Sequence, residues 1–117
     1  VISFNESLQN LNRLSKITSP NDGLFIIKNN ALLNLTGLVN VTNIQWNLTI
    51  EDNESLLSLD GLKALTDFFF MDINDNRCLT DFCTLENALI NDHFGFNARH
   101  NAFNPSGQDI FYGNCSL

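Results

Sequence analysis

The feature that most constrains this chain is a repeat of about 24 residues. Four isoleucines are each followed three residues later by an asparagine, and successive isoleucines are 24, 24 and 23 residues apart. Self-similarity at such a period is the signature of a solenoid, in which each coil buries its apolar residues only against its neighbours. The sequence therefore predicts about four stacked coils. The isoleucine and asparagine pairs are Ile2/Asn5, Ile26/Asn29, Ile50/Asn53 and Ile73/Asn76.

Two segments recur within each repeat. The pattern Leu-x-Ile-x-x-Asn occurs at 24–29 and 48–53, with methionine in place of leucine at 71–76. The pattern Leu-Leu-x-Leu-x-Gly-Leu follows at 32–38 and 56–62. Alternation along a strand sends successive side chains to opposite faces, and stacked coils place equivalent strands about 4.8 Å apart. We therefore expect a parallel β-sheet with the leucines and isoleucines turned inward.

These segments resemble leucine-rich repeats, most closely the receptor L-domain type, over about residues 1–85. The resemblance implies an α/β fold, a right-handed parallel β-solenoid whose repeats occupy residues 1–83. Members of that family are extracellular, bind ligands and have no catalytic activity, so the resemblance implies the same here. Two copies depart from the pattern: Arg13 stands where others have glycine, and in the third copy we assign Cys83 to the glycine position and Phe82 to a leucine position.

The period stops at Thr84, and residues 84–117 are expected to form a C-terminal cap of helix, strand and helix. We predict a helix from Thr84, as N-cap, to about Ile90, then a strand at 94–98. Pro105 is expected at the first position of a second helix, which Gly113 would end. This tail is similar to the closing segment of secreted bacterial surface proteins built on these repeats. Four phenylalanines are expected to cover the open end of the core: Phe94, Phe96, Phe103 and Phe111.

Three cysteines leave one thiol over after a single disulfide. We favour a bridge between Cys83, where the chain leaves the solenoid, and Cys115, near the end of the tail. Pairing Cys78 with Cys115 closes a loop of similar length and stays open as an alternative, while a Cys78–Cys83 bridge would only staple residues that the repeat already holds. Cys78 would then be a small buried residue with a free thiol.

The asparagine column and the first coil carry two further expectations. The amides should be buried and should satisfy backbone groups in the turns. Ile2 and Phe4 open the first coil without a capping sequence. A sheet edge would thus be exposed there, so we expect either preceding residues in the native protein or self-association through the N-terminal coil.

Composition limits the partners. The formal net charge is −7 and only 16% of residues are charged, which argues against nucleic acid or an anionic membrane surface. No apolar run approaches the roughly 20 residues needed to span a membrane, so we expect no membrane insertion. Disulfide formation implies an oxidising compartment, hence an extracellular or cell-surface location, and the chain is interpreted as a piece of a longer precursor.

The outward strand face is the candidate binding surface. The functional interpretation is a rigid recognition face, and the alternatives are ordinary solvated alternation or, for Phe25 and Ile27, edge packing against a neighbouring chain. The predicted binding residues are Phe25, Ile27, Thr49, Glu51, Asp72 and Asn74, with Ser3 beside them.

Other sites are not expected. Glu51, Asp52, Asp72 and Asp75 have no EF-hand spacing, and the cysteines and histidines have no zinc-site spacing, so we predict no metal. A flat sheet offers no cleft in which to desolvate a catalytic acid, and His93 and His100 lie in the cap, so we predict no catalytic residues and no cofactor.

Two functions follow. The first is an extracellular, non-catalytic recognition module that binds a protein or glycan through the strand face. The second is a structural spacer or self-associating unit of a larger cell-surface protein.

Overall fold

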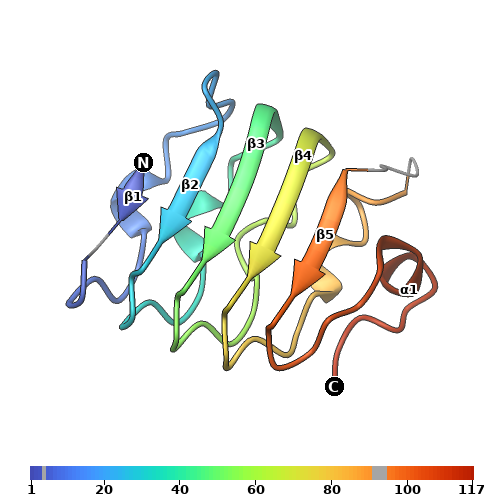
Figure 1. Ribbon diagram of the computed structural model, residues 1–117. Helices are drawn as coiled ribbons and strands as arrows, with labels where there is room; N and C mark the ends of the chain where they lie inside the picture. The colour runs from blue at the N-terminus through green and yellow to red at the C-terminus, as the bar shows by residue number, and fades with distance from the viewer. Residues whose placement is uncertain (4, 91–94) are drawn as a thin grey trace.

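The computed structural model describes residues 1–3, 5–90 and 95–117 and shows a parallel β-solenoid of about four turns (Figure 1). Neighbouring strands are parallel and follow chain order, and Ile26 lies beside Ile50, which lies beside Ile73. This register confirms the alignment of the repeats. The five strands are β1 (Ile2–Ser3), β2 (Leu24–Ile27), β3 (Asn43–Glu51), β4 (Asp67–Asn74) and β5 (Phe96–Arg99).

The leucine-rich segments return each coil to the next strand. They contain short 3-10 helices, η1 (Asn12–Leu14), η2 (Thr36–Leu38) and η3 (Cys83–Leu85). Coils pack so closely here that a Cβ atom on Gly61 would lie 1.7 Å from the Leu35 carbonyl oxygen. Six leucines of these segments are fully buried in the core, as expected: Leu32, Leu35, Leu38, Leu56, Leu59 and Leu62.

The last coil corrects the predicted assignment of Cys83. A bridge between Ser58 and Asp81 sets the offset between these coils, which places Cys83 opposite Asp60 and Thr84 in the glycine column. The Thr84 hydroxyl donates to the Asp60 carboxylate at 3.0 Å. The prediction that Phe82 takes a leucine position is confirmed, because Phe82 is fully buried.

The segment after η3 differs from the predicted helix at 84–90. The 3-10 helix begins at Cys83, so Phe82 rather than Thr84 is at the N-cap position, and the Cys83 backbone N–H donates to the Asp81 carboxylate at 2.9 Å. Turns follow as far as Ile90 while Leu85 and Leu89 stay in the core. The predicted strand is found as Phe96–Arg99, and its predicted start at Phe94 lies outside the described residues.

The C-terminal helix α1 (Gly107–Phe111) begins two residues later than predicted. The Ser106 hydroxyl accepts from the Asp109 N–H at 3.0 Å, and the Asp109 carboxylate accepts from the Ser106 N–H at 2.9 Å. This capping box makes Ser106 the N-cap and leaves Pro105 outside the helix. Gly113, with φ +86°, follows the helix end as expected.

The phenylalanines of the tail contribute unequally to the core. Phe96 and Phe103 pack against it, but Phe111 is half exposed and Ile110 is buried instead. Phe94 lies outside the described residues. The helix turns its Ile110 side inward, which sends the adjacent Phe111 outward.

The predicted disulfide between Cys83 and Cys115 is present. The Phe82 N–H also donates to the Cys115 carbonyl at 2.8 Å, so the tail is bonded to the last coil beside the bridge. Cys78 is free, as predicted, but it is exposed rather than buried. Asn76 and Leu79 are the buried residues of that turn, and the two residues between them face solvent.

Candidate binding surface

One edge of the sheet, where the strands end, is built on the asparagine column. Asn29, Asn53 and Asn76 are fully buried, which confirms the predicted burial for these three, whereas Asn5 in the first coil is exposed. The Asn29 N–H donates to the Asn53 Oδ1 at 2.9 Å, and the Asn53 N–H donates to the Asn76 Oδ1 at 3.0 Å. Each Nδ2 donates in turn to an isoleucine carbonyl of the coil before it, as Asn53 does to Ile26 at 2.9 Å. We call this edge the asparagine ladder.

Two features of the ladder were not predicted: a further asparagine and a shared backbone conformation in the residue before each asparagine. Asn101 takes a further position, because the Asn76 N–H donates to its Oδ1 at 3.0 Å. The residue before each of the four asparagines, from Asn29 to Asn101, has a positive φ of 55° to 58°. These left-handed residues turn the chain inward and place polar side chains at the end of each strand: Lys28, Asp52, Asp75 and His100.

The predicted binding residues are brought together on the outward face of β2, β3 and β4. Phe25 lies beside Thr49, which lies beside Asp72. The second row places Ile27 beside Glu51 and Glu51 beside Asn74. The six residues thus form two rows across three strands, with Ser3 extending the second row onto β1.

The members of this surface differ in accessibility. Phe25, Ile27, Thr49, Glu51 and Asp72 are partly exposed. Asn74 is only 8% exposed, which corrects its predicted availability. With its nitrogen toward Asp72, the Asn74 amide donates to both carboxylate oxygens at 3.2 and 3.3 Å, so it supports Asp72 rather than facing a ligand.

Asp72 is also held from β5. The Asn97 amide donates to the Asp72 Oδ1 at 3.0 Å, and an Arg99 guanidinium nitrogen lies 3.7 Å from its Oδ2. His100 lies 3.4 Å from the Asp75 carboxylate through its Nδ1. The Arg99 guanidinium of the last strand and the His100 imidazole just after it therefore already lie on the acidic part of the face.

The opposite edge of the sheet, where β3 and β4 begin, carries exposed aromatic rings that the sequence did not indicate. The register shifts between Ile44 and Asn47, because β3 has one residue more than β4 over this stretch. Trp46 lies in this bulge and is 57% exposed. Its ring lies 6.0 Å from that of Phe69, which is 68% exposed, in an edge-to-face arrangement. We call Trp46 and Phe69 the aromatic pair.

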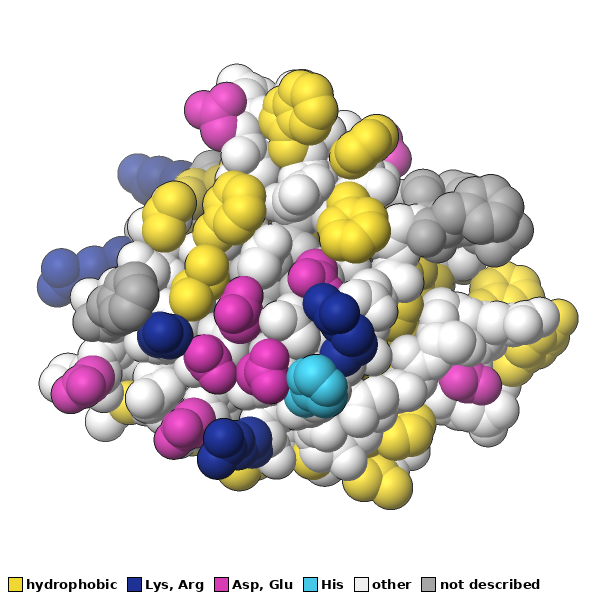
Figure 2. All heavy atoms as spheres, in the orientation of Figure 1, with side chains coloured by type: hydrophobic (Ala, Val, Ile, Leu, Met, Phe, Trp, Pro, Cys, Tyr) yellow, Lys and Arg dark blue, Asp and Glu magenta, His cyan; other side chains and the backbone are white. Residues whose placement is uncertain are grey.

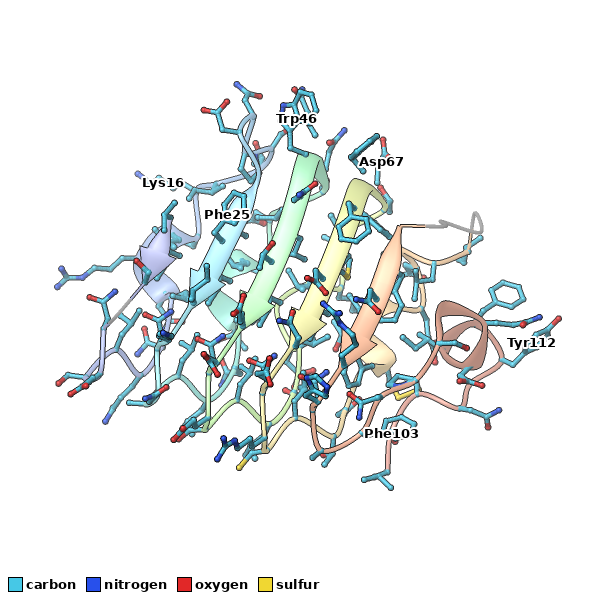
Figure 3. The ribbon with its side chains drawn as sticks, viewed as in Figure 1. Lys16, Phe25, Trp46, Asp67, Phe103 and Tyr112 are labelled. Carbon is cyan, nitrogen blue, oxygen red and sulfur yellow. A yellow bond between two sulfur atoms is a disulfide. The ribbon has the colours of Figure 1, made fainter. Side chains whose placement is uncertain are left out.

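The two edges of the face differ in chemistry (Figure 2). Hydrophobic side chains gather in the upper part of the view and acidic ones below them. Figure 3 places Trp46 and Asp67 at the upper ends of β3 and β4, with Phe25 lower on β2. The change of spacing from 24 to 23 residues signals a one-residue irregularity between these coils, and the structure places it in β3 as the bulge at Trp46.

Three further candidate features are a metal-ligand cluster, a histidine of the cap and a membrane-spanning helix. Cys83, Glu86 and Cys115 bring potential metal-ligand atoms within 4.8 Å of one another, but both sulfurs are joined in the disulfide. His93 lies outside the described residues. Nowhere in the part of the chain that the structure describes is a helix long and apolar enough to cross a membrane.

Comparisons with protein-family models, curated proteins and solved structures found no match to this chain.

Proposed function

We propose that the protein is a non-catalytic recognition module of the leucine-rich, L-domain-like type, right-handed and capped by residues 84–117. It acts outside the cell or at the cell surface and binds a protein or glycan through the outward face of β2–β4. The observation that carries this proposal is that β3 and β4 carry both the two rows and the exposed aromatic pair, with only the paired residues Asn47 and Phe70 between them on the outward face. Exposed neighbouring apolar groups on a rigid sheet mark contact surfaces, and aromatic residues are enriched in such interfaces. The disulfide agrees with an oxidising compartment.

Glycan and peptide arrays test this function. We expect the wild-type protein to bind a subset of spots, and Phe25→Ala or Glu51→Ala to abolish that binding. Phe111→Ala is the control, because it removes an accessible phenylalanine ring that lies on α1, outside the face. Equal binding by the face variants, or no bound spot at all, would contradict a recognition role.

A structural spacer or self-associating unit is the second candidate, and the first coil favours it. Among the described strands β1 pairs only with β2, and apolar residues around it are partly buried, including Ile2, Leu8 and Ile17. An edge strand with unpaired backbone groups can add a second chain. Sedimentation velocity over a wide concentration range distinguishes the two: self-association that Ile2→Lys removes favours the spacer, and a monomer at all concentrations excludes it.

A further inference from the structure

We infer that the partner of the strand face is an arginine-rich polypeptide segment. This inference rests on the proposed recognition function and narrows it to one class of partner. Two separate features of the face, its carboxylates and its exposed rings, attract the same kind of group.

The lower part of the face favours cations. Acidic side chains outnumber basic ones there: Glu51, Asp52, Asp72 and Asp75, against Lys28, Arg99 and the imidazole of His100. Complementary charge determines which partners approach and in which orientation. The protein's own Arg99, whose side chain is 56% exposed, demonstrates that a guanidinium group can lie across this surface at Asp72.

The upper part favours the same group for a different reason. The faces of aromatic rings carry negative electrostatic potential, and tryptophan is the strongest of them toward cations. Guanidinium groups stack on such rings because they are planar and weakly hydrated, which an ammonium group is not. The bulge holds Trp46 out from the sheet, where it is accessible to such stacking.

The spacing of the two parts fits a short extended segment. Asn47, next to the aromatic pair, and Glu51 are four residues apart on β3, which is about 13 Å along a strand. A partner segment of about five residues covers that distance, and its alternate side chains would all face the sheet. A neutral glycan would stack on the rings and its hydroxyls would donate to the carboxylates, but it carries no charge to complement theirs, so the observations favour the peptide.

Fluorescein-labelled Arg-Gly-Arg-Gly-Arg-Gly-Arg is the probe, titrated by anisotropy at physiological salt. Citrulline, the neutral isostere of arginine, replaces arginine in the control peptide, and cellohexaose and chitohexaose test the glycan alternative. Trp46 is the only tryptophan, so its fluorescence reports binding of the unlabelled peptide and of both sugars at the aromatic pair.

We expect Trp46→Ala to weaken binding of the arginine peptide about fivefold, as the loss of one cation–π contact implies. Glu51→Gln should weaken it about twofold to threefold, as for an exposed ion pair. The matched controls are Phe111→Ala and Glu86→Gln, which lie outside the face and should leave the affinity unchanged. The citrulline peptide should bind far more weakly than the arginine peptide.

Equal binding of the arginine and citrulline peptides, or equal effects of the control variants, would overturn the inference. A sugar that binds in a Trp46-dependent manner while the arginine peptide does not would overturn it too, but would leave the proposed recognition function in place. If none of these peptides and sugars binds, and no spot on the glycan and peptide arrays is bound, both the inferred partner and the proposed recognition function would be overturned.

Discussion

The two edges of the sheet are built on opposite principles. The asparagine ladder is regular, fully buried and hydrogen-bonded from coil to coil, whereas the aromatic pair lies at a break in the register and is exposed. Buried polar groups that lose their partners cost free energy, while exposed side chains contribute little to stability. The difference suggests that stability is concentrated at the ladder and recognition at the aromatic edge.

The largest expected loss of stability comes from removing the disulfide that joins the tail to the last coil. Replacing both Cys83 and Cys115 by serine should lower the free energy of unfolding by roughly 3–4 kcal/mol, since the bridge closes a loop with a sequence separation of 32. Urea denaturation measures this loss, and Cys78→Ser is the control because that thiol is free and exposed. A loss no greater than that of the control would show that the tail is held without the bridge.

Within the ladder, Asn53→Ala should cost about 1–3 kcal/mol, because it leaves the Asn29 N–H and the Ile26 carbonyl without their partner. Asn5→Ala is the matched comparison, since Asn5 belongs to the same column but is exposed, and its cost should be well below that of Asn53→Ala. Similar losses for the two variants would mean that burial does not determine the ladder's contribution.

The repeat was predictable because each coil imposes the same constraint on the next. Inward isoleucines, buried asparagines and the close-packed Gly61 all follow from stacking, and the sequence shows them at a fixed period. The aromatic pair was not predictable in the same way, because Trp46 has no equivalent in the other coils and its position depends on a one-residue bulge. The tail was also harder, since hydrogen bonds of individual side chains such as Asp81 and Ser106 decide where its short helices begin.

A smaller effect is expected in helix α1, which lies at neither edge of the sheet. The Ser106 backbone N–H, and then its hydroxyl, hold the pKa of Asp109 below its ordinary value. A lowered folded-state pKa contributes stability above the unfolded-state pKa that is lost as the pH falls through the folded one. Below about pH 4 we therefore expect α1 to loosen, seen as a lower protection factor of the Ile110 amide against hydrogen exchange. Asp109→Asn should remove this pH dependence, and a protection factor that does not change with pH would argue against the cap.

The most direct test takes one variant from each edge of the sheet and measures both stability and affinity for each. The double variant Trp46→Ala/Phe69→Ala and the single variant Asn53→Ala are each assayed for unfolding free energy in urea and for affinity toward the arginine peptide. The account predicts that the aromatic variant stays within about 0.5 kcal/mol of wild type but loses affinity, as for exposed substitutions. Asn53→Ala should lose stability and keep its affinity under conditions where it is folded. Loss of both properties in both variants, or unchanged affinity in the aromatic variant, would contradict the separation of stability from recognition.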